Sequence, residues 1–353
     1  MAISSVAFSP KEFRMAIQPQ TALGTALTDG MLELNVDSIT HGTLGGINNY
    51  EIKSGGGRIF QDEHYFHQNS DYISEISVSG IYTVDTCFPM LENILYDVSE
   101  PFQIESSYSP SVAIKTGATL SAGNSELLTL AIMPPDSPND GSPSDTDTIL
   151  YKDCVVTAFS WSGDMGTDGG LVRYSATFKT YSPVGLGVDG SGYTITPYSL
   201  IAAQTLTMSD WQTPANRMIG GQADVMINSF AMNLDNDAVF LGRGASGVPE
   251  AIGRGAELSA TADMNVKYDD ESADMLNMFQ AATSGSGGDG TTQKTNMSNA
   301  STPATGASWG FQFPLSVFTN VALSEGDIMG IDASVKMVGY GNGTTTVCAT
   351  IAD

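Results

Sequence analysis

Positive charge is scarce in this sequence. Its 353 residues contain 14 Lys and Arg against 39 Asp and Glu, which gives a formal net charge of −25. A surface this acidic repels phosphate groups and anionic lipids, so the charge argues against a groove that grips nucleic acid through its backbone. The same charge is compatible with plain solubility or with adaptation to salty surroundings.

Histidine and cysteine are scarcer still. The three histidines, His41, His64 and His67, fall in one Gly-rich stretch, which leaves little material for an acid–base or nucleophilic catalytic set. The three cysteines are odd in number, far apart and in no metal-binding spacing, which predicts reduced thiols in a protein made in a cytoplasm. Carboxylates are abundant, so a hydrolase with paired acids stays open at this point.

Long apolar runs are also missing. No segment is apolar for long enough to cross a bilayer. The first residues, 1–6, lack the basic and apolar regions of a signal peptide. We therefore expect no membrane association.

Three short motifs suggest a cofactor or metal, and the context of each argues against it. Residues 185–190 fit G-x-G-x-x-G, but no helix pattern follows to hold a pyrophosphate, so we predict a linker. Asp62, Glu63, His64 and His67 lie in a Gly-rich stretch without a fixed scaffold. Residues 235–237 lack the glycine and distal glutamate of a calcium loop. We expect no cofactor, no metal and no enzymatic activity.

One pattern is used twice in the chain. From Glu257 to Tyr268, small or apolar residues alternate with polar ones, which predicts a strand with one dry and one wet face. An acidic turn then leads to residues 275–279, which are spaced as in a helix. The same order starts at Glu75, and the apolar stripe of a short helix follows from Met90. In this alignment Glu75 matches Glu257.

Further landmarks recur in the same order. Residues 333–336 line up with 176–179, and 311–313 with 128–130. Apolar or alternating patterns predict further strands at 127–133, 154–161, 172–178, 225–234, 311–318 and 331–338. Together they predict an internal duplication. We expect a mainly β protein with two tandem β-sandwich or barrel domains, each with one short flanking helix, divided as an N-terminal arm (1–29), a first domain (30–190) and a second domain (191–353).

A family resemblance rests on three segments of the second half, 224–236, 253–264 and 325–327. They read as a strand that ends in Asp-Asn, a Gly-rich entry to the next strand, and an acidic turn before the closing strand. In this order they resemble the tail tube (major tail) proteins of long-tailed bacteriophages. The first half keeps the order of elements but differs from the pattern in residue identity, because Gly255 has no clear counterpart before Glu75.

The resemblance implies a structural virion protein that polymerises into stacked rings around a DNA channel. It implies tube-like domains, and rings of three chains that imitate six when each chain carries two such domains. The implied partners are further copies of the chain and other tail proteins, such as a tape measure and a tail terminator. Double-stranded DNA would pass through without specific binding, and the location would be the virion tail, assembled in the host cytoplasm.

The wet faces of the two repeated strands are the candidate channel wall. Their serines and threonines give a wetted surface without charge, and their acids repel phosphate. The lumen-lining candidates are Glu75, Ser77, Ser79, Glu257, Ser259, Thr261 and Asp263.

The two long Gly-rich loops, 41–71 and 242–255, are candidate contacts to the next ring. Glycines permit extended or left-handed backbone there, and cationic side chains can pair with acids of a neighbouring subunit. The inter-ring candidates are Arg58, His64, His67, Arg243 and Arg254.

Two other classes remain open. One is an acidic carbohydrate-binding or hydrolytic β-sandwich, which would need aromatic side chains in a surface cleft, whereas Trp161, Trp211 and Trp309 are scattered along the sequence. The other is a different virion shell or sheath subunit. A capsid fold would have a long spine helix, and the sequence shows no pattern for one.

Overall fold

A computed structural model of the protein describes twenty segments of the chain. The described residues are 12–20, 22–26, 30–41, 47–51, 65–69, 73–95, 112–115, 127–133, 148–182, 184–186, 195–196, 217–220, 222–223, 225–242, 248–254, 258–283, 293–298, 308–326, 329–337 and 348–352.

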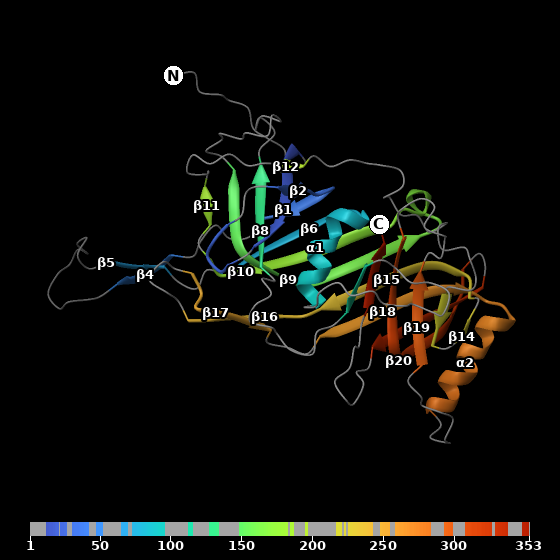
Figure 1. The fold of residues 1–353 in the computed structure, drawn as a ribbon. Helices are drawn as coiled ribbons and strands as arrows, with labels where there is room; N and C mark the ends of the chain where they lie inside the picture. Colours follow the sequence, from blue (N-terminus) through green and yellow to red (C-terminus); the bar gives the residue numbers. More distant parts are fainter. Residues whose placement is uncertain are drawn as a thin grey trace.

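Strands dominate these residues, and the prediction of a mainly β chain is confirmed (Figure 1). The elements up to residue 186 are β1 (Arg14–Pro19), β2 (Met31–Glu33), β3 (Ser38–Thr40), β4 (Ile47–Glu51), β5 (Tyr65–Asn69), β6 (Ser74–Ile81), α1 (Val84–Leu95), β7 (Val112–Lys115), β8 (Leu128–Met133), β9 (Ile149–Asp164), the 3₁₀ turn η3 (Asp168–Gly170), β10 (Arg173–Thr180) and β11 (Gly185–Leu186). Those that follow are β12 (Ile195–Thr196), β13 (Arg217–Ile219), β14 (Gln222–Ala223), β15 (Ile227–Asp235), β16 (Ala238–Leu241), β17 (Ala251–Arg254), β18 (Ser259–Lys267), α2 (Asp270–Thr283), β19 (Gln293–Ser298), β20 (Ser308–Ser324), β21 (Gly330–Met337) and β22 (Cys348–Ala352).

One path of antiparallel strands runs through both halves of the chain. Its order is β3–β6–β10–β9–β15–β18–β21–β20. The first four strands come from the first half and the last four from the second, so the pairing of β9 with β15 joins the halves. This path is part of a single 18-stranded sheet, beside which stand two separate hairpins, β4–β5 and β16–β17.

Two long strands, β9 and β20, each connect the path to a further set of paired strands. The 16 residues of β9 pair with β10 at one end and with β8 at the other, and β8 leads on to β1 and β2. The 17 residues of β20 pair with β21 and then with β19, which leads on to β13 and β14. The pairing order of the first half therefore recurs in the second.

The irregularities of these long strands recur as well. Thr157 is left out of the β9–β10 pairing, and Thr319 is left out of the β20–β21 pairing. Each is a β-bulge, with two residues opposite one. The Thr157 hydroxyl donates to the Thr177 carbonyl (3.3 Å), and the Thr319 hydroxyl donates to the Ser334 carbonyl (3.2 Å).

The register of the repeat corrects the alignment made from the sequence. Glu75 lies opposite Lys179, while the residue opposite Lys336 is Thr261 rather than Glu257. Glu75 also stands nine positions before the first residue of α1, and Thr261 nine before the first residue of α2. An alternating pattern looks the same after any even shift, so the strand alone left this four-residue error undetected.

The N-terminal segment differs from the expected arm. Met15, Ala16 and Ile17 are fully buried in β1, which pairs with β8 along its whole length. A strand that is buried on both faces shows no alternation, so the period-two test missed it. Tyr268, the last residue of the alternating pattern, was expected on the dry face of its strand, but it is exposed.

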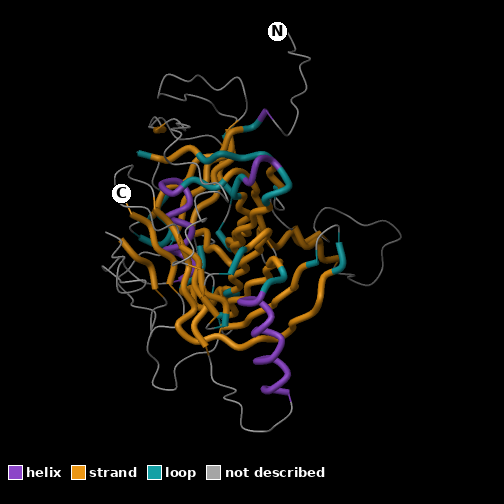
Figure 2. Tube along the Cα trace, turned by 90° about the vertical axis from the view of Figure 1, so that its right-hand side faces the viewer, coloured by secondary structure: helices purple, strands orange, loops and turns teal. Residues whose placement is uncertain are grey.

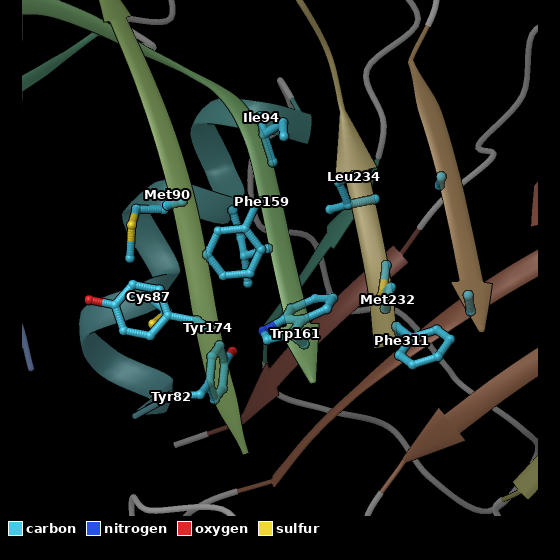
Figure 3. Packing of buried hydrophobic residues seen from close by; sticks show 14 of the residues in the cluster. Tyr82, Cys87, Met90, Ile94, Phe159, Trp161, Tyr174, Met232, Leu234 and Phe311 are labelled. Atoms are coloured by element: carbon cyan, nitrogen blue, oxygen red, sulfur yellow. The ribbon is translucent and has the colours of Figure 1, made fainter. Parts of the chain in front are cut away.

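The dry faces of the path form one core with the buried residues of both helices (Figure 3). Met90 and Ile94 of α1 pack in this core beside Phe159, and Trp161 stacks on Phe311 from the second half at 6.3 Å between ring centroids. Figure 2 shows the strands curving round the interior, with α2 outside them at one end. The helices therefore lie on the dry side of the path, and no helix of the described residues covers its other face.

Candidate functional site

The face of the strand path that no described helix covers is mostly polar, and it extends across both halves of the chain. Directly paired residues of an antiparallel sheet lie on the same face, so the register gives its rows. One row consists of Ser79, Ser175, Ser160, Asn233, Thr261 and Lys336. The next row consists of Thr40, Ser77, Thr177, Ala158, Asp235 and Ser259. We call this surface the wet face.

The structure brings the predicted lumen candidates together on this face. Those that it describes are Glu75, Ser77, Ser79, Ser259, Thr261 and Asp263. Glu257 lies outside the described residues. The residues between them along β6 and β18, such as Val78 and Met264, are buried on the opposite side. The sequence separated the two faces correctly, but it gave no sign that both strands belong to one continuous surface.

Cations on the wet face are matched by additional acids. The Arg173 guanidinium donates to Asp168 (2.6 Å) and to Asp37 (2.5 Å), and these hydrogen bonds raise the pKa of Arg173, with the bond to Asp168 contributing most. Lys179 donates to Asp237 (2.8 Å), and this hydrogen bond lowers the pKa of Asp237. Arg173 and Lys179 are therefore neutralised locally and present little free positive charge to a passing polyanion, whereas Lys336 of the first row is exposed.

Four further acids of the wet face form no salt bridge with the described cations. Glu75, Asp235, Asp263 and Asp332 are all exposed on it. The Asp332 carboxylate accepts a hydrogen bond from the Asn265 amide (2.6 Å), a neutral donor that leaves its charge in place. The wet face is therefore built from hydroxyls, amides and small side chains, with acidic charge in excess.

A partly buried guanidinium group connects the two halves at the joint between β9 and β15. Arg254 at the end of β17 donates to the carbonyls of Asn93 (2.5 Å), Val156 (2.6 Å) and Asn236 (2.7 Å). Asn236 in turn donates to the carbonyl of Ile94 in α1 (2.8 Å). These contacts, which we call the Arg254 clamp, hold α1, β9, β15 and the β16–β17 hairpin together.

This clamp corrects one inter-ring candidate. Arg254 was predicted to pair with a neighbouring subunit, but its guanidinium is already satisfied by carbonyls of its own chain. Arg58, His64 and Arg243 lie outside the described residues. His67 belongs to β5, where it pairs with Asn49. Nothing in the sequence marked Arg254 as internal, since its acceptors are backbone atoms of distant segments.

The two long loops each contain a hairpin that the sequence did not show. β4 pairs with β5 in the first loop, and β16 pairs with β17 at the border of the second. Both hairpins project from the same side of the molecule, away from the large sheet (Figure 1). Their positions agree with the repeat, since each follows the strand that precedes the repeated strand-and-helix unit in sequence.

The described residues were compared with the requirements of a metal site and of a reactive thiol. They contain no group of three His, Cys, Asp or Glu side chains placed to hold a metal ion. Cys87 and Cys154 are buried cysteines, and burial raises the pKa of Cys154 well above its usual value, with a further contribution from the Asp153 charge. A hollow of about 310 Å³ beside the β9–β10 turn includes Asp168 and Arg173, which are already paired with each other.

The motifs that suggested cofactors have ordinary structural places where the chain is described. Gly185 and Leu186 form β11, which pairs with β9. Asp62 and Glu63 lie outside the described residues, as does the remainder of the glycine motif. No helix in the described part of the chain is long and apolar enough to cross a membrane. Comparison with protein-family models and with curated proteins finds no match to this chain.

Proposed function

We propose that this chain is the structural subunit of a tail tube, polymerising into stacked rings with the wet face towards the channel. The observation that carries the proposal is the strand path through both halves, which is dry on one side and wet on the other. A sheet with two exposed ends is prone to edge-to-edge association, and closure around a ring removes those edges. The free face then becomes the inner wall.

The chemistry of the wet face supports passage of duplex DNA without binding. Proteins hold DNA chiefly by lysine and arginine contacts to phosphate, and affinity grows with their number. On the wet face, Arg173 and Lys179 are paired with aspartates, and the remaining charge is mainly acidic. Hydroxyl and amide groups keep the wall wetted, so DNA can slide past it.

The repeated pairing order supports a chain of two tandem tube-like domains. Both halves share the pairing order of their strands, the threonine bulge and the helix after the equivalent strand. We place the domains at 30–190 and 191–353, with β1 added to the first. Each is proposed to be a small β-sandwich or barrel with one flanking helix, so that a ring of three chains has pseudo-sixfold symmetry.

The proposal carries further expectations about partners and place. The tube would meet a tape measure inside and a tail terminator at its end, in a virion tail assembled in the host cytoplasm. The subunit would have neither enzymatic activity nor a cofactor. A sugar-binding β-sandwich is less well supported, because Trp161, one of the three tryptophans that could line its cleft, is buried in the core.

Negative-stain electron microscopy of the purified protein tests the proposal. We expect hollow rings or tubes with a bore wide enough for duplex DNA, and native mass spectrometry should give three chains per ring. A protein that stays monomeric at every concentration would contradict the tube. Six chains per ring would retain the tube but contradict the pseudo-sixfold arrangement.

A further inference from the structure

The two ends of the strand path are unpaired within the described part of the chain. At one end, β3 pairs with β6 alone. At the other end, β20 pairs with β21 as far as Ser324, while its pairing with β19 stops at Ser316. The last residues of β20 therefore have a neighbour on one side only, and Asn320, Ala322 and Leu323 are exposed.

Comparison of the two halves indicates which strand would pair with the free edge of β20. In the first half, β9 takes the place of β20, and its corresponding residues pair with β15 on the side away from β10. In the second half, β15 takes the place of β3, because Ala231 lies opposite Asp263 as Thr40 lies opposite Ser77. Hence β20 corresponds to β9 but lacks a neighbour equivalent to β15. In the same way, β3 corresponds to β15 but lacks a neighbour equivalent to β9.

An apolar cluster at the end of β9 is buried by the joint. Tyr82, Trp161 and Val172 are 0%, 1% and 0% exposed, and the Tyr82 amide donates to the Val172 carbonyl (2.9 Å). Trp161 lies opposite Met232 of β15 and stacks on Phe311 of β20 (Figure 3). The second half of the chain thus covers this cluster.

The counterpart of that cluster in the second half is open. Tyr268, Leu323 and Met329 are 42%, 49% and 47% exposed, and the Tyr268 amide donates to the Met329 carbonyl (3.2 Å). The same backbone arrangement therefore holds a buried cluster in one half and an exposed one in the other. We call the exposed set the open patch.

We infer that β3 of a second copy pairs with the free edge of β20 and that its first half covers the open patch, repeating between chains the joint that β9 and β15 make within the chain. This inference rests on the proposed ring and identifies its interface. In the internal joint, Ser162 lies opposite Ala231. The equivalent pair between two chains is Ser324 opposite Thr40, and in this register Leu323 lies opposite His41. The contact is head-to-tail, so it forms rings when its rotation closes and open chains when it does not.

The second copy offers apolar groups where they are needed. Phe311, which covers Trp161 within the chain, has Ile149 of β9 as its counterpart in the first half, so the alignment of 311–313 with 128–130 made from the sequence was wrong. Ile149 is half-buried. His41 lies edge-on to Phe13, with 5.8 Å between ring centroids. The first half of a second copy thus presents Ile149, His41 and Phe13 to the open patch.

Disulfide cross-linking tests the register directly. Cα atoms of directly opposed residues are about 4.5–5.5 Å apart, within the range of a disulfide. With Cys348→Ser as background, Thr40→Cys combined with Ser324→Cys should form covalent oligomers upon mild oxidation, whereas neither single variant should. The control combines Thr40→Cys with Asn320→Cys, four residues further along β20 and about 14 Å away, and should stay uncross-linked.

The outcomes separate this interface from the proposed function. Rings seen by microscopy without the 40–324 cross-link, or with an equally efficient 40–320 cross-link, would overturn the inferred register and leave the tube standing. If no rings form under any condition, the tube and this interface fall together. A 40–324 cross-link that gives covalent oligomers no larger than one ring supports both the tube and this interface.

A second pair of variants tests the open patch. Leu323→Asp should raise the concentration needed for assembly at least tenfold, while the circular dichroism spectrum and melting temperature of the monomer stay unchanged, because Leu323 is half exposed. Ala322→Asp changes the neighbouring residue on the wet face of the same strand and should assemble like the wild type. Assembly of Leu323→Asp at the wild-type concentration would overturn the role of the patch.

Discussion

Arg254 donates to carbonyl groups of three separate segments, and this is the contact that sequence patterns are least able to reveal. Its acceptors belong to Asn93, Val156 and Asn236, and a backbone carbonyl has no signature in the residue type. The sequence predicted a surface cation in a Gly-rich loop. The arginine instead holds the joint between the halves, where a planar group with several donors fits and a point charge does not.

Replacing Arg254 by Lys should destabilise the chain by about 2–3 kcal/mol. An ammonium group cannot reach the three carbonyls at once, and hydrogen bonds to charged groups contribute about 1.5–3 kcal/mol. Urea unfolding followed by tryptophan fluorescence measures the loss. Arg173→Lys is the matched control, since this guanidinium is 43% exposed and its ion pairs should be worth less than about 1 kcal/mol. Equal unfolding midpoints for both variants would contradict the clamp.

Elements were predictable where one face is dry and the other wet. Alternation located β6 and β18, and helical spacing located α1 and α2 within a few residues. The same test missed β1, where consecutive residues are all buried, and the short strands of the two hairpins. Bulges were also beyond reach, because one extra residue shifts the faces on either side and leaves no mark in composition.

The two bulge threonines provide a comparison within one chain. Thr157 is buried and Thr319 is exposed, although each hydroxyl donates to the equivalent carbonyl. Thr157→Val should cost about 1 kcal/mol, since the Thr177 carbonyl loses a donor that water cannot replace. Thr319→Val should cost less than about 0.5 kcal/mol in the monomer, where water substitutes. Chemical denaturation of the two variants measures the difference, and a larger loss for Thr319→Val would contradict this account of burial.

At the scale of the whole molecule, the sequence indicated a repeat but not how its copies are connected. Two alternating strands in one sequence are compatible with separate sheets, with facing layers or with one continuous path. The pairing of β9 with β15 selects the continuous path, and it depends on residues more than sixty positions apart. Such a pairing follows from packing and the closure of long loops, which no local pattern contains.

The acidity of the wet face gives the last prediction. Asp263 and Asp332 are exposed on neighbouring rows of β18 and β21, and their conversion to Lys should make the assembled protein retain linear duplex DNA. Binding should weaken steeply with salt, because each phosphate contact releases a counterion. Co-sedimentation of DNA with protein assembled in its presence, over a range of salt concentrations, measures the effect, and the wild type should retain none.

The control places the same charge elsewhere. Asp270→Lys with Asp274→Lys changes the net charge equally, but on α2, whose residue Met275 packs in the core on the dry side of the path. If the wet face lines the channel, this variant should bind DNA only on the outside of the tube, where added DNA remains open to nuclease. DNA retained by the Asp263→Lys, Asp332→Lys variant should instead be protected. Equal nuclease sensitivity in both would mean that the wet face does not enclose the DNA.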